Sequence, residues 1–138
     1  MLQVMSYVNA PIHDLLIRIK NAYMARKPIV EWVSFSKFKQ QVLELLKQYG
    51  FIRDIEIIEE DWKKMINIHL NPVKDSVNDI PNVKFYSKPS RAWYVRSKDI
   101  HTVAGWKGIG IISTSQGLMA SHVAKQKKIW WELIAEIY

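Results

Sequence analysis

Apolar residues recur at helical spacing near the start of the chain. They lie three or four positions apart with polar residues between them, and the series is Ile12, Leu15, Leu16, Ile19 and Tyr23. This spacing places one apolar stripe along a helix and predicts a helix over residues 11–23. Pro11 suits the first turn of such a helix, because a proline there loses no hydrogen bond.

A strand and a second helix are predicted next. Residues 29–35 alternate loosely between apolar and polar side chains, which indicates a strand. Ser36 is placed to cap a helix whose apolar residues again form one stripe, and Gly50 is placed to end it. The sequence therefore predicts a strand followed directly by a capped helix.

Two further runs have the pattern of a hairpin. Residues 51–58 and 65–70 are apolar and β-branched, and the acidic residues 59–61 separate them. In the second run we expect Ile66, Ile68 and Leu70 to face one way, and Asn67 and His69 to face the other.

The second half of the chain is predicted to be mostly strands. The expected strands are residues 83–86, 92–95, 109–112 and 131–138, and a short helix over 121–127 has Ser121 as its cap. Few apolar residues occur before them, over 71–82. We therefore expect an α+β protein of two small subdomains, residues 1–71 and 83–138, joined by a linker at 72–82.

Composition favours a folded protein with a polyanionic partner. Nearly half of the 138 residues are apolar, the chain has no cysteine, and the formal net charge is +7. The charge is unevenly distributed, at +4 over residues 1–49, −3 over 50–80 and +6 over 81–138. The apolar runs are far shorter than the roughly 20 residues that span a membrane, so we expect no membrane association.

The glycines and histidines of the sequence complete no catalytic, cofactor-binding or metal-binding motif. The glycines at 108 and 110 are followed by serine where a dinucleotide-binding fingerprint requires glycine, and no phosphate-binding lysine follows. The four histidines lie at no metal-ligand spacing. We therefore expect neither enzymatic activity nor a metal, a cofactor or a small-molecule substrate.

Three adjacent hydroxyl side chains provide the most distinctive candidate site. Ser113, Thr114 and Ser115 are followed by Gly117, which allows a tight turn. The shallow minor groove of an RNA helix presents 2′-hydroxyls, which short donor and acceptor side chains can reach. The pattern is equally consistent with a turn in which a hydroxyl caps the backbone, and the residues alone do not decide between the two.

Two basic groups could reach phosphate. In the first, Ser87, Lys88, Pro89 and Arg91 form a stiff basic turn, and nearby Tyr94 is placed to stack on a base or sugar. Trp93, next to Tyr94, is expected in the core because neighbouring strand residues face opposite ways.

The second basic group comes from the two predicted helices. It contains Arg18, Lys20 and Asn21, with Lys37 and Lys39 at the start of the next helix. A solvated helix face explains the same pattern.

In their order along the chain, these segments resemble the bacterial form of small-subunit ribosomal protein eight. The matching segments are Pro11–Tyr23, Tyr49–Asp54, Ser87–Pro89 with Arg91 and Tyr94, Gly108–Gly110 and Ser113–Met119. The resemblance implies two helices on a three-stranded sheet, then a mostly β part with a short helix. It also implies binding to the central domain of small-subunit ribosomal RNA, beside neighbouring ribosomal proteins. The RNA-binding residues that it implies are Ser113, Thr114, Ser115, Gly117, Ser87, Lys88, Pro89, Arg91, Tyr94, Arg18, Asn21, Lys37 and Glu132.

The sequence also departs from the family pattern. Gln116 and Ala92 replace basic residues, Ser90 replaces a glycine, and two tryptophans at 130 and 131 replace a pair of glycines before Glu132. Such departures favour a mitochondrial ribosome as the location, with a plastid or a bacterial cytoplasm as alternatives. The alternative functions are a protein-interaction module and a regulator that binds messenger RNA.

Overall fold

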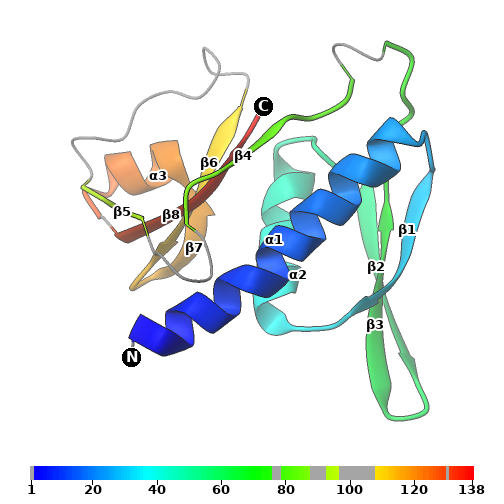
Figure 1. Ribbon diagram of the computed structural model, residues 1–138, viewed down its shortest axis with the longest axis horizontal. Coiled ribbons are helices and arrows are strands. Elements are labelled where there is room, and N and C mark those ends of the chain that lie inside the picture. Colours follow the sequence, from blue (N-terminus) through cyan, green and yellow to red (C-terminus); the bar gives the residue numbers. More distant parts are fainter. Residues whose placement is uncertain (1, 76–78, 88–92, 97–107, 130) are drawn as a thin grey trace. The chain divides into compact units, whose positions relative to one another are not determined.

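The computed structural model describes residues 2–75, 79–87, 93–96, 108–129 and 131–138, with backbone alone for residues 2–11 and 131 (Figure 1). The chain forms two compact units, one of Leu15–Pro81 and one of Met1–Asp14 with Asn82–Tyr138. The α+β class is confirmed. The subdomain boundaries expected from the sequence stay a prediction, because contacts do not show that either part folds by itself.

The unit Leu15–Pro81 packs helices on a three-stranded antiparallel sheet of order β1-β3-β2. One face of the sheet is buried: Val30, Val33, Ile66 and Ile68 are at most 6% exposed, as are Leu16, Val42 and Leu46 of the helices. The face predicted to be shared by Ile66, Ile68 and Leu70 is thus confirmed, and it is the buried one. The elements are α1 (Leu2–Met24), β1 (Ile29–Ser34), α2 (Lys37–Gln48), β2 (Asp54–Glu60) and β3 (Lys63–His69).

Helix α1 begins earlier than its pattern predicts. It starts at Leu2 and runs through Pro11, so the expectation that Pro11 occupies the first turn is wrong. A proline inside a helix removes one backbone hydrogen bond, but here it does not end the helix. The sequence before it, Leu2–Ala10, contains no glycine or second proline that would stop the helix.

The ends of α2 follow their sequence signals. The hydroxyl of Ser36 accepts a hydrogen bond from the Lys39 backbone N–H at 3.1 Å, which confirms the predicted cap. After the helix, Gly50 has a φ of +80°, a conformation that glycine adopts without a steric penalty.

Tyr23 ties α1 to the loops beside it. Its hydroxyl donates a hydrogen bond to the Phe51 carbonyl and accepts one from the Asn71 backbone N–H. Burial raises the pKa of Tyr23, since the phenolate form would lose hydration. The hydroxyl therefore remains a donor at neutral pH and fixes the end of α1 on its unit.

The other unit contains a five-stranded antiparallel sheet. Its path is β4-β8-β6-β7, and β5 also pairs with β8 (Figure 1). The sequence pattern did not predict strand β7. The hydroxyl stretch has the composition of a connection, but the chain turns back there within two residues and pairs with β6. The elements are β4 (Val83–Phe85), β5 (Tyr94–Val95), β6 (Ile109–Thr114), β7 (Gly117–Ala120), α3 (Ser121–Gln126) and β8 (Trp131–Ile137).

Helix α3 packs against β6 through a close contact at Gly110. The cap position of α3 is Ala120, so the prediction that Ser121 caps this helix is wrong. The Ser121 hydroxyl instead accepts a hydrogen bond from the Gly110 backbone N–H at 3.1 Å. A Cβ added to Gly110 would lie 2.9 Å from the Ser121 Cβ, so only glycine fits. Ile112, Met119, Ala124 and Leu133 form the core beside this contact.

Candidate nucleic-acid interface

The three hydroxyls lie at the hairpin between β6 and β7. Thr114 pairs with Gly117 across a two-residue turn of Ser115 and Gln116. We call Thr114–Gly117 the hydroxyl turn. Thr114 Oγ1 donates to the Gly117 carbonyl at 2.7 Å and accepts from the Gln116 backbone N–H at 3.1 Å. Thr114 therefore organises the turn, whereas Ser115 is exposed and Ser113 is half-buried.

Three strands align polar side chains from distant parts of the chain. Ser113 on β6 lies opposite Glu132 on β8, and Glu132 lies opposite Tyr94 on β5. Residues directly opposite each other in a sheet point to the same face, so these three form one row, which we call the polar row. Glu132 is 1% exposed and Tyr94 is 40% exposed. The row thus places a hydroxyl, a carboxyl group and a phenol ring side by side.

Ser87 positions one end of the polar row. It is fully buried, donates a hydrogen bond to the Leu133 carbonyl and accepts one from the Trp93 backbone N–H, both at 2.8 Å. Leu133 N–H in turn donates to the Trp93 carbonyl at 2.8 Å. Ser87 therefore holds the start of β5 against β8, and its hydroxyl supports Tyr94 from inside the protein.

Substitution of Ser87 should reveal this supporting role. Ser87→Ala removes the buried hydrogen bond to the Leu133 carbonyl and the part-buried one from the Trp93 N–H, so we expect the free energy of unfolding to fall by about 1–3 kcal/mol. The exposed serine variant Ser115→Ala is the matched control and should stay within about 0.5 kcal/mol of the parent. Urea denaturation measures both, and equal stability of the two variants would contradict the role given to Ser87.

Trp93 differs from its prediction. The side chain is 45% exposed, so the expectation that it lies in the core is wrong. Its ring meets the edge of Tyr86, with centroids 5.9 Å apart. Strand β5 has only two residues and, among the described residues, pairs with β8 alone, so alternation there does not place a core on one side. Lys88, Pro89 and Arg91 lie outside the described residues, and their contact with RNA stays a prediction.

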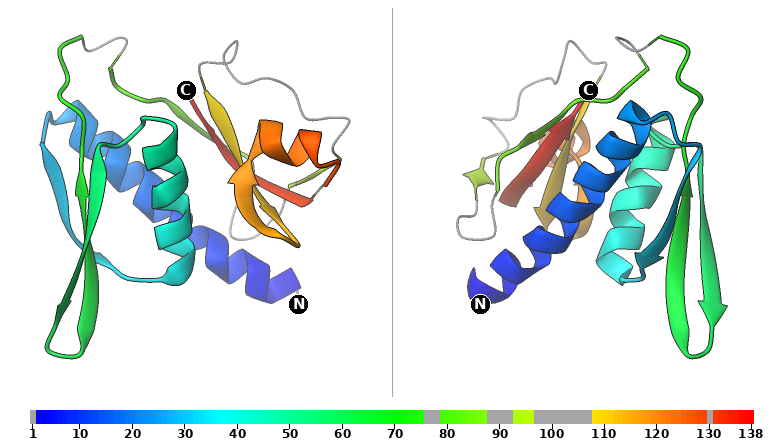
Figure 2. Two further views of the ribbon diagram at one scale, coloured as in Figure 1. Left: turned by 180° about the vertical axis from the view of Figure 1, so that it is seen from behind. Right: turned by 45° about the vertical axis from the view of Figure 1, so that its right-hand side comes forward.

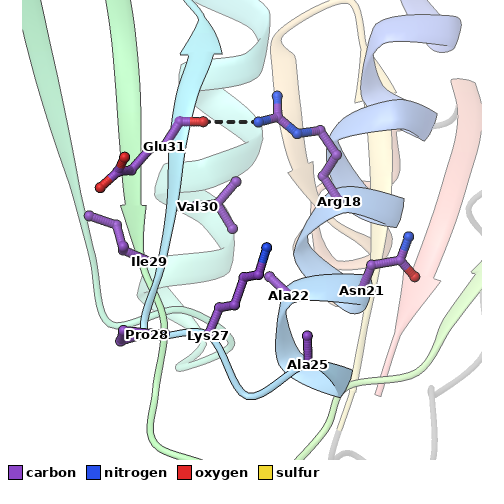
Figure 3. A pocket seen from close by; sticks show the side chains of 9 residues that line it. All are labelled: Arg18, Asn21, Ala22, Ala25, Lys27, Pro28, Ile29, Val30 and Glu31. Carbon is purple, nitrogen blue, oxygen red and sulfur yellow. Dashed lines mark hydrogen bonds between the residues drawn. The ribbon is translucent and has the colours of Figure 1, made fainter.

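Part of the helical basic group lines a groove between α1 and β1 in the unit Leu15–Pro81 (Figure 3). The groove has a volume of about 680 Å³. Arg18 donates to the Glu31 carbonyl at 2.9 Å, which holds its guanidinium at one wall. Asn21 and Lys27 also line the groove.

The sequence pattern did not single out Lys27 as a groove residue, and Lys37 is not among the residues that line the groove. Lys27 follows α1 in a connection with no motif of its own, so only the folded chain brings it beside Arg18. Lys37 is the exposed first residue of α2 and is not among the residues that line the groove. RNA contacts by Arg18, Asn21 and Lys37 remain predictions.

No candidate metal site occurs in the part of the chain that the structure describes. There, no group of three histidine, aspartate or glutamate side chains gathers to hold an ion. Among the same residues, no helix combines the length and the apolarity needed to cross a membrane. The polar row offers hydrogen-bonding groups and the groove offers cations, which is the chemistry of a binding surface.

Comparison with known proteins gives consistent matches over most of the chain. The family model described as ribosomal protein S8 matches residues 10–138. Small ribosomal subunit protein uS8 of Dictyoglomus thermophilum is 41% identical over 131 residues, covering 95% of this chain and 98% of its own. The protein of the same name from Enterococcus faecalis is 41% identical over 128 residues, covering 93% and 96%. That from Streptococcus uberis is 38% identical, with the same coverage.

Proposed function

Because this chain belongs to the ribosomal protein S8 family, we propose that it binds the central domain of small-subunit ribosomal RNA and supports its assembly. The related proteins are named as constituents of the small ribosomal subunit. Direct RNA contact is the further step that the proposal adds. No catalytic role is assigned to the chain.

The observation that carries the proposal is the alignment of Ser113, Glu132 and Tyr94 on one face of the sheet, next to the exposed Ser115. Hydroxyls at this position can exchange hydrogen bonds with 2′-hydroxyls and base edges in a wide minor groove. The exposed Tyr94 ring adds a surface on which a base or sugar can stack. Gly117, with a φ of +110° and open space around its Cα, lets the backbone approach the RNA closely.

Positive charge supplies the attraction that does not depend on sequence. The chain carries a net charge of +7, and cations such as Arg18 and Lys27 line a groove large enough for a phosphate group. Phosphate contacts position a protein on nucleic acid, while contacts at the bases and sugars select the site. The groove and the polar row would thus have complementary tasks.

Specific binding to one RNA tests the proposal. We expect the purified chain to bind a central-domain transcript at least about tenfold more tightly than an unrelated folded RNA of equal length, a difference of about 1.4 kcal/mol. Affinity for both should fall with added salt as counterions compete for the phosphates. Equal affinities for the two RNAs at every salt concentration would refute specific recognition.

The ribosome is the location that family membership supports. The relatives described above are bacterial, so they give no support to the mitochondrial ribosome that the sequence composition favours, and that placement stays part of the proposal. Co-sedimentation of the chain with small subunits from isolated mitochondria would test it.

A further inference from the structure

The hairpin of β2 and β3 extends beyond the rest of its sheet. Strand β1 pairs with β3 only as far as Ser34 opposite Met65, and Phe35 adds one more bond, to the Lys64 carbonyl. Pairing between β2 and β3 continues to Glu60 opposite Lys63. Figures 1 and 2 show the tip of this hairpin projecting past α2. The tip is therefore free of cover from its own unit.

Trp62 at this tip is fully exposed and has a backbone conformation that is unfavourable for a bulky residue. The whole side chain is exposed to solvent, at 104% of its reference area. Asp61 and Trp62 have φ values of +47° and +69°, the combination of a turn that favours asparagine or aspartate followed by glycine. A bulky residue with positive φ is strained, and its exposed ring gains nothing from burial. Neither the turn nor the core of the unit explains a tryptophan here.

The charge around Trp62 identifies the kind of partner that would cover it. The tip, residues 59–64, has three carboxylates and two lysines, a net charge of −1 in a chain of +7, whereas Asp54 lies at the far end of β2 and pairs with Lys47 at 2.9 Å. Lys63 and Lys64 lie opposite Glu60 and Glu59, so glutamates face both lysines. The net negative charge of the tip favours lysine or arginine side chains over phosphates.

We propose that the tip of the β2–β3 hairpin docks a segment rich in lysine and arginine from a neighbouring protein of the small subunit, with one cation over the Trp62 ring. An ammonium or guanidinium group over an indole face is attracted by the ring quadrupole. Carboxylates of the hairpin would pair with the remaining cations of the segment. The inference rests on the proposed function only in taking its partner from the ribosome.

Crosslinking in the assembled subunit tests the contact. The chain would carry a photoreactive benzoylphenylalanine in place of Trp62, and adducts from purified small subunits would be identified by mass spectrometry. We expect an adduct with one peptide of another ribosomal protein, a peptide with an excess of lysine and arginine. An adduct with RNA, with a second copy of this chain or with an acidic or neutral peptide would overturn the proposal, as would the absence of an adduct.

A glycine variant separates docking from folding. Trp62→Gly supplies the residue that the turn favours, so the chain should unfold at the same or a higher temperature. In small subunits, however, retention of the crosslinked neighbour during a salt wash should fall by about threefold or more, the scale of one exposed cation–π contact. Retention equal to that of the parent would overturn the proposal.

Two controls make the result specific. Trp32→Gly changes another exposed tryptophan with positive φ, at 63% exposure and +60°, and should leave retention unchanged. Affinity for the central-domain transcript should stay within about twofold for Trp62→Gly, because the substitution removes no cation from the chain. If this affinity fell, the tip would contact RNA and the inference would be wrong. If the parent itself failed to bind the transcript, the proposed function would fail while the crosslink still decided the docking.

Discussion

Gly110→Ala will lower the free energy of unfolding by about 2–3 kcal/mol, the upper part of the range for overpacking a well-filled core. The added methyl group would lie 2.9 Å from the Ser121 Cβ and 3.0 Å from its hydroxyl oxygen. The Ser121 Cβ is fixed to the backbone of α3, so a rotamer change cannot remove the clash. Relief requires α3 to move away from β6, which would lengthen the Gly110 N–H to Ser121 hydrogen bond.

A double-mutant cycle isolates that contact. Ser121→Gly removes both the Cβ and the hydroxyl, so in its presence the added methyl group at position 110 keeps only the contact with Leu133 Cδ1 among its three nearest, at 3.4 Å. The two substitutions together should therefore cost at least about 1 kcal/mol less than the sum of the single variants. Guanidinium denaturation of the four proteins supplies the comparison, and strictly additive losses would show that the clash with Ser121 is not the cause.

The double substitution Ser113→Ala and Ser115→Ala will weaken binding to the central-domain transcript by about 2–4 kcal/mol, roughly thirtyfold to a thousandfold. Each hydroxyl would leave an RNA donor or acceptor without its partner in the interface. Ser113 stands at the end of the polar row, and Ser115 is exposed on the hydroxyl turn. The single variant Ser115→Ala should account for about 1–3 kcal/mol of the loss.

The loss must come from contact rather than from unfolding. Thr114 is left intact in this variant, so the bonds that shape the turn, from Thr114 Oγ1 to Gly117 and from Gln116 to Thr114 Oγ1, persist. Gln41→Ala, which removes an exposed polar side chain from α2 in the other unit, serves as the control and should keep the parent's affinity within about twofold. If the double variant binds the transcript as the parent does, the polar row is not the RNA surface.

Local signals in the sequence predicted much of the fold. Ser36 caps α2 as expected, because the cap depends on a hydrogen bond to a residue three positions away. The shared face of Ile66 and Ile68 followed from alternation within one strand. Such features need only neighbouring residues, so a pattern of a few positions is sufficient to indicate them.

Features that depend on distant residues were not predictable in this way. Ser121 was expected to cap α3, yet its hydroxyl binds Gly110, eleven positions earlier. The groove brings Lys27 beside Arg18 only after the chain turns from α1 into β1. Trp93 was assigned to the core by alternation, although β5 is a two-residue strand at the margin of the sheet.

The candidate site was predictable in its members but not in its arrangement. Ser113, Tyr94 and Glu132 were named from the sequence and its family resemblance. Their placement in one row depends on the register of β5, β6 and β8, which are separated by long connections. Ser87 and Thr114 were named with them, but the folded chain engages both hydroxyls in internal hydrogen bonds. Sequence alone does not distinguish a hydroxyl that supports the surface from one that forms it.

The most direct test of the central claim is to cleave RNA with a reagent attached to the hydroxyl turn. The chain has no cysteine, so Ser115→Cys creates a single attachment point for an iron chelate that releases hydroxyl radicals. In reconstituted small subunits, we predict cleavage of small-subunit ribosomal RNA in its central domain, on both strands of one helix facing its minor groove. Cleavage spread evenly over the RNA, or absent from the central domain, would contradict the account.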